Sequence, residues 1–71
     1  MVATRINGSL NPRLLRTKDA ARYLGMSAGQ IRRLVQDGML PVIKNGTGEH
    51  APFLLDIRDL DSYVERAKVT L

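Results

Sequence analysis

The stretch TKDAARYLGMSAGQIRRLVQDG, at residues 17–38, decides the fold. Thr17 is a predicted N-cap for a first helix, because its hydroxyl can accept a hydrogen bond from the first turn. Ala20, Ala21 and Leu24 then place small and apolar groups on one face of that helix. Gly25 is predicted to end it, since glycine adopts the left-handed conformation of a helix terminus at little cost.

A second helix is predicted directly after this glycine. Ser27 and Gln30 have the Ser-x-x-Gln spacing of a capping box, in which each side chain accepts a backbone N–H of the other residue. Ile31, Leu34 and Val35 follow at the spacing of one apolar helical stripe. Asp37 and Gly38 are predicted to end this helix.

The offsets of four residues predict that the two helices form a helix-turn-helix unit. Ala21 is small enough for the helices to cross closely, and Gly25 permits the tight turn between them. Ile31 and Leu34 hold the second helix against the first, which leaves its opposite face exposed. In proteins with this unit, the second helix enters the major groove of DNA.

Beyond this unit the hydrophobic pattern changes. Short apolar runs at residues 39–43 and 53–55 flank a loop, residues 44–52, that is rich in turn-forming residues, and this pattern favours a β-hairpin. Asp56 is a predicted N-cap for a third helix. The apolar side of that helix comprises Ile57, Leu60 and Val64, with Tyr63 beside it.

We therefore predict an α+β fold that is mostly helical: a winged helix-turn-helix with three short helices and a β-hairpin wing. The domain is expected at residues 14–67, after a flexible N-terminal arm at residues 1–13 and before a tail at residues 68–71. Leu14 and Leu15 are expected to anchor the chain before the first helix.

Composition narrows the possible functions. The chain has 71 residues, no cysteine and one histidine, so it lacks the residues for a disulfide framework or a multi-histidine metal site. No nucleophile–base pair and no phosphate-binding loop is present, so we expect neither an enzyme nor a bound cofactor. No membrane-spanning or signal segment is visible, which leads us to expect a cytoplasmic protein, bacterial or phage-encoded.

The charge is unevenly distributed along the chain. Residues 1–33 carry seven basic side chains and one acidic one, whereas residues 34–71 carry four basic and six acidic ones. A basic half next to an acidic half is typical of a protein that presents one face to a polyanion. Double-stranded DNA is therefore the expected partner.

Several residues are candidates for DNA contacts. Arg32 and Arg33 point away from the apolar stripe, and each can pair with guanine or neutralise a phosphate; the sequence does not assign the two tasks. Gln30 either completes the capping box or reads adenine. The full predicted interface comprises Arg22, Ser27, Ala28, Gln30, Arg32, Arg33, Lys44, Asn45 and Thr47.

The hairpin is open to two interpretations. Lys44, Asn45, Thr47 and His50 can lie along the DNA backbone or enter the minor groove, or the segment can be a simple connector. Glu49 argues against deep insertion, because phosphates repel a carboxylate. Gly29 is similarly ambiguous: it either permits close approach to DNA or is a tolerated first-turn residue.

The motifs at residues 15–27, 31–41 and 56–64 resemble the excisionase-like branch of the MerR-type winged-helix domains. The resemblance implies a sequence-specific DNA-binding protein that bends DNA to direct an integrase, or a small transcriptional regulator. It also implies cooperative binding to neighbouring sites. Full-length MerR-type regulators continue into a dimerisation helix and an effector domain, which we expect to be absent here because nothing follows Leu71. Cooperativity is then expected from head-to-tail contacts on DNA or from an integrase partner. The wing departs from the family pattern, because its tip lacks the usual arginines. A protein-interaction adaptor that uses the acidic second half is the alternative from another class.

Overall fold

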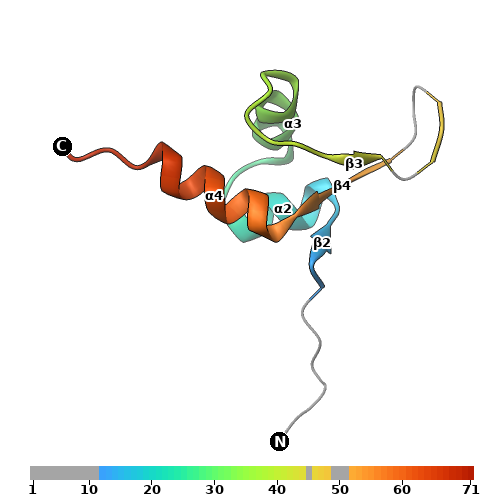
Figure 1. The fold of residues 1–71 in the computed structure, drawn as a ribbon, viewed down its shortest axis with the longest axis horizontal. Coiled ribbons are helices and arrows are strands. Elements are labelled where there is room, and N and C mark those ends of the chain that lie inside the picture. Colours follow the sequence, from blue (N-terminus) through green and yellow to red (C-terminus); the bar gives the residue numbers. More distant parts are fainter. Residues whose placement is uncertain (1–11, 45, 49–51) are drawn as a thin grey trace, which may run out of the picture.

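A computed structural model of the chain describes residues 12–44, 46–48 and 52–71. These residues form three helices and a three-stranded antiparallel sheet (Figure 1). In chain order, the elements are β2 (Leu14–Leu15), α2 (Thr17–Leu24), α3 (Ala28–Gln36), β3 (Ile43–Lys44), β4 (Phe53–Asp56) and α4 (Ile57–Ala67).

Helices α2 and α3 form the predicted helix-turn-helix. Ala21 is 5% exposed where the two helices pack, so a larger side chain there would push them apart. Gly25 ends α2 with φ of 70°, a left-handed conformation that favours glycine. The turn is closed by the Met26 N–H, which donates to the carbonyl oxygen of Ala21 at 2.8 Å. The predicted roles of Ala21 in the helix crossing and of Gly25 in the turn are therefore confirmed.

The start of α2 differs from the prediction. Thr17 is the first helical residue, and the N-cap position belongs to Arg16, whose side chain makes no cap hydrogen bond. The reason lies outside the helix. Leu15 pairs with Leu55 of β4, which keeps the chain extended through Arg16 and starts the helix at the next residue.

The sheet has the order β2–β4–β3, with β4 in the middle. Ile43 pairs with Leu54 in the β3–β4 hairpin, which confirms the predicted wing. The first wing strand is shorter than the apolar run at residues 39–43 predicts, because Leu40 turns into the core and is 2% exposed. Strand β2 was not predicted, since two leucines are too few to show an alternating pattern.

Helix α4 leaves the sheet directly from β4. The Asp56 carboxylate accepts the Arg58 N–H at 2.9 Å, which confirms the predicted N-cap. Near the other end of α4, the Arg66 guanidinium donates to the carbonyl oxygen of Met39 at 3.2 Å and ties the helix to the turn after α3. No helix in the described part of the chain is long and apolar enough to cross a membrane.

The core lies where the three helices meet the central strand. Its largest fully buried side chains are Ile31, Leu40, Leu55 and Leu60, and two small residues, Ala20 and Ala21, complete it. This arrangement confirms the predicted winged helix-turn-helix fold. The core leaves one side of α3 uncovered, and that side carries the candidate site.

Candidate nucleic-acid interface

The outward face of α3 is a stripe made by Gly29, Arg33 and Gln36, and all three residues are exposed. Their spacing of four and then three residues places them on one side of a helix that turns about 100° per residue. Ile31, which is fully buried, marks the opposite side. Gln36 was absent from the predicted interface, although its position seven residues after Gly29 already placed it on this stripe.

Gln30 lies outside this outward stripe and is engaged within the protein. Its side-chain oxygen accepts the Ser27 N–H at 2.9 Å, and its own N–H donates to the Ser27 hydroxyl oxygen at 3.1 Å. The predicted capping box is therefore formed. Of the two predicted roles of Gln30, the structure shows the cap.

The neighbouring arginines of α3 face different surroundings, although both are exposed. Arg32 lies one turn after Ala28, and both line a groove towards the start of α2. Arg33 lies on the other side, where its Nε atom is 4.0 Å from a carboxylate oxygen of Asp37. Arg33 also borders a shallow hollow that Tyr63 of α4 helps to line. The predicted pair is thus divided between two surfaces.

The groove beside Arg32, called the basic groove below, has a volume of about 330 Å³. It is lined by Arg16, Thr17, Lys18, Ala28, Arg32, Pro52 and Phe53. Three of these side chains are cationic: Arg16 at the N-cap of α2, Lys18 in α2 and Arg32 in α3. Arg16 and Lys18 were absent from the predicted interface, because only the fold brings the start of α2 next to α3.

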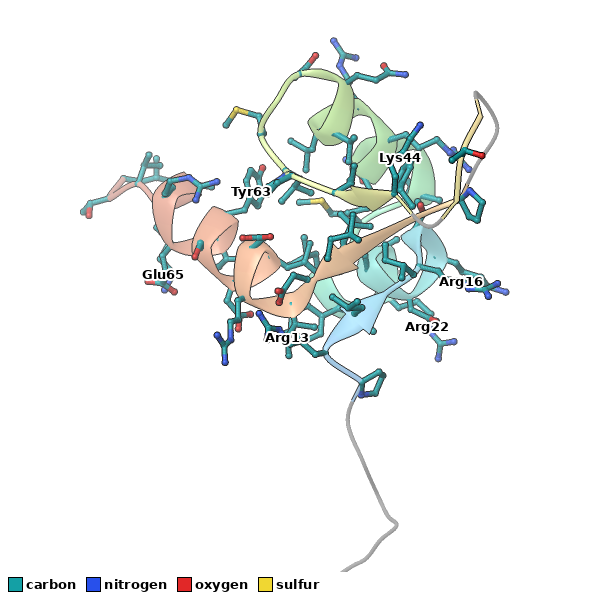
Figure 2. The ribbon with its side chains drawn as sticks, turned by 45° about the vertical axis from the view of Figure 1, so that its right-hand side comes forward. Arg13, Arg16, Arg22, Lys44, Tyr63 and Glu65 are labelled. Carbon is teal, nitrogen blue, oxygen red and sulfur yellow. The ribbon has the colours of Figure 1, made fainter. Side chains whose placement is uncertain are left out.

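Three further predicted contacts, Arg22, Lys44 and Thr47, are exposed in the described part of the chain. Arg22 is exposed in the last turn of α2, and Lys44 is exposed on β3. Figure 2 shows Arg16, Arg22 and Lys44 on one side of the molecule. Thr47 is exposed in the hairpin loop, whereas the predicted contact Asn45, like Glu49 and His50, lies outside the described residues.

Acidic side chains gather elsewhere, and several are bonded within the protein. The Arg13 guanidinium lies 2.9 Å from the Asp56 carboxylate, and their hydrogen bond holds the pKa of Asp56 below its usual range. The Tyr23 hydroxyl donates to Asp61 of α4 at 2.6 Å, which raises the pKa of Tyr23. Figure 2 shows Glu65 of α4 on the side opposite Arg16 and Arg22. Among the residues that the structure describes, no acidic side chain lines the basic groove.

Comparisons with known proteins agree with this arrangement. The family model described as a helix-turn-helix domain matches residues 14–68, which is most of the chain. No curated protein and no solved structure matches significantly. The chain therefore belongs to the helix-turn-helix domain family, a DNA-binding family that includes excisionase-like proteins, and membership implies that it binds DNA.

Proposed function

We propose that this protein is a sequence-specific double-stranded DNA-binding factor of the excisionase-like, MerR-type branch. In this proposal it acts by binding and bending DNA, without catalysis, so that an integrase can assemble on the bent site. The observation that carries the proposal is the outward stripe of α3. Gly29, Arg33 and Gln36 are exposed together on the helix that this fold presents to the major groove.

The stripe has the chemistry for reading base edges. Arg33 can donate two hydrogen bonds to guanine, and the amide of Gln36 can pair with adenine in the same groove. Gly29 carries no side chain, so the backbone of the first turn can approach the bases closely. The arginine–Asp37 contact is exposed and 4.0 Å long, and such a pair contributes little stability, so Arg33 can leave it for DNA.

Membership of a family that includes excisionase-like proteins supports the role in recombination. The motifs at residues 15–27 and 31–41 resemble the MerR-type branch and support this assignment. Cooperative contacts between neighbouring DNA-bound copies would help to bend the site. A stand-alone transcriptional regulator would use the same surface, so the two roles require a functional test.

DNA binding is tested by fluorescence anisotropy with random-sequence and selected duplexes over a range of salt concentrations. Contacts to about five phosphates predict a slope of log K against log salt near −4.5. Arg33→Ala with Gln36→Ala should lower the ratio of specific to non-specific affinity, whereas Arg58→Ala, a matched control on α4, should not. An absence of binding to every duplex at low salt would refute the proposal.

The recombination role is tested with the integrase encoded nearest to the gene for this chain. Excision of a reporter cassette by that integrase is measured with and without the protein, and bending is measured by circular permutation of the binding site. Stimulated excision on a bent site is the expected result. Binding without stimulation, at a site that overlaps a promoter, would instead identify a transcriptional regulator.

A further inference from the structure

The basic groove brings together three cations from two separate segments of the chain. Arg16 and Lys18 are at the start of α2, and Arg32 is on α3. Pro52 and Phe53, at the base of the wing, form an apolar wall beside them. The groove therefore combines positive charge with an apolar wall, beside the helix that carries the outward stripe.

These cations have no acidic partner among the described residues. None of them is within 4.0 Å of a carboxylate oxygen in that part of the chain. Clustering like charges is unfavourable unless a counter-charge is bound. The positive end of the α2 dipole adds charge of the same sign, and Asp19 in the first turn offsets part of it. The cap position of α2 supplies no side-chain acceptor to that turn.

We propose that the basic groove is a phosphodiester-binding site that holds one backbone strand of the duplex beside the major groove. Arg16, Lys18 and Arg32 bind its phosphates, and the apolar wall packs against the sugars. The inference rests on the proposed DNA binding and deepens it. Because Arg32 faces this groove and Arg33 lies on the outward stripe, the adjacent arginines have separate tasks: Arg32 binds backbone, and Arg33 reads bases.

The first test replaces each cation without creating a large gap. Arg16→Gln, Lys18→Gln and Arg32→Gln are compared with Arg58→Gln, which removes the same charge from an exposed position on α4. Each groove variant should reduce the magnitude of the salt slope by about 0.9. Each should weaken binding to all duplexes by the same factor, so sequence preference stays unchanged. The control should leave the slope unaltered.

A second test locates the contact on the DNA and uses the unaltered protein. Single phosphates of a bound duplex are replaced by neutral methylphosphonates, and affinity is measured at each position. One to three adjacent positions on a strand flanking the major groove should weaken wild-type binding. In each groove variant, the replacement should have little further effect at the phosphate that the missing cation would bind, because that charge pair is already lost, and should keep its effect at the other positions.

The outcomes separate this inference from the proposed function. If the wild-type protein binds no duplex, DNA binding itself is refuted. If it binds, but Arg16→Gln and Lys18→Gln match the Arg58→Gln control, only the groove is refuted. A change of base preference in Arg32→Gln, with an unchanged salt slope, would overturn the separation of tasks. Circular dichroism of each variant checks that it is folded before binding is measured.

Discussion

At the scale of single residues, the contacts that a polar side chain on α3 makes within the protein affect how readily it can reach DNA. Gln30 and Gln36 illustrate the difference. The amide of Gln30 accepts a hydrogen bond from the Ser27 N–H at 2.9 Å and helps to hold the start of the helix. Gln36 lies on the outward stripe and makes no side-chain hydrogen bond to the described residues. The same residue type thus has a structural role at one end of α3 and an exposed position at the other.

Replacing each of these two glutamines by alanine should have opposite effects on stability and on base preference. Gln30→Ala removes half of the capping box and should lower the thermal midpoint by a few degrees, because loss of a cap costs on the order of 1 kcal/mol. Base preference, measured by binding-site selection, should stay the same. Gln36→Ala should leave the thermal midpoint unchanged and relax the preference at one base pair. Altered base preference in Gln30→Ala would show that its amide leaves the cap on DNA.

Gly29 allows protein stability to be separated from DNA affinity. A Cβ atom at this position would meet only the Ser27 hydroxyl, at 3.8 Å, which is an ordinary contact. Gly29→Ala should therefore stabilise the free protein by up to about 1 kcal/mol, because alanine is the better helix former. Its DNA affinity should fall if the backbone approaches the bases closely. Thermal melts and anisotropy measure the two effects, and an equal or higher affinity would make Gly29 a merely tolerated residue.

At the scale of elements, β2 is attached to the rest of the fold at the junction between β4 and α4. The Ile57 N–H donates to the carbonyl oxygen of Arg13 at 2.9 Å, and the Arg13 side chain pairs with Asp56. Asp56 also caps α4 through the Arg58 N–H. One carboxylate therefore serves both the helix end and the attachment of β2.

The charge of Asp56 should make stability depend on pH. Its pKa in the folded protein is lowered by the hydrogen bond from Arg13, so the carboxylate stabilises the fold above its unfolded pKa of about 3.9. This stabilisation is lost as the pH falls through the lower, folded pKa. Asp56→Asn keeps a cap acceptor but removes the charge, so it should melt several degrees lower at pH 7 and match the wild type once the carboxyl is protonated.

Asp56→Ala is the matched variant, because it removes the cap as well as the charge. It should be less stable than Asp56→Asn at pH 7. In acid it should remain less stable than the wild type to the extent that the protonated Asp56 side chain still caps α4. Thermal melts from pH 7 to pH 2 give both curves. A constant difference between Asp56→Asn and the wild type over this range would show that the ion pair with Arg13 adds no stability.

At the scale of the whole molecule, a very small core supports the interface. Four large side chains, those of Ile31, Leu40, Leu55 and Leu60, are fully buried, and they come from four different parts of the chain. A core of this size supplies only about 3–5 kcal/mol of net stability. The orientation of α3 therefore depends on residues that never approach the DNA.

Leu60→Ala should unfold most of the protein in the absence of DNA. The substitution removes a fully buried leucine at a cost of about 2–5 kcal/mol, which is comparable to the entire stability. Saturating duplex DNA should restore the helical circular dichroism signal, because a ligand that binds only the folded state stabilises it. Val69→Ala, at an exposed position in the C-terminal segment, is the control. A cooperative melt at the wild-type midpoint would contradict this account of the core.

Much of the fold was predictable because its signals are local. Gly25, the Ser27–Gln30 capping box and Asp56 each act within a few residues, so their spacing alone located the helix ends. The error at Thr17 has the opposite origin. Its hydroxyl suits an N-cap, but the pairing of Leu15 with a strand 40 residues later shifts the cap to Arg16.

The sequence by itself determined the helix-turn-helix, the hairpin wing and the exposed side of α3, because helical periodicity shows which residues face the core. Only the tertiary structure decided how the cations are grouped. Helical periodicity already turns the neighbours Arg32 and Arg33 about 100° apart. The tertiary structure decides what each one faces: the start of α2 for Arg32, and Tyr63 of α4 for Arg33. Arg16 joins Arg32 because α2 crosses α3 and β2 pairs with β4. Such groupings depend on contacts between distant segments, which no local pattern specifies.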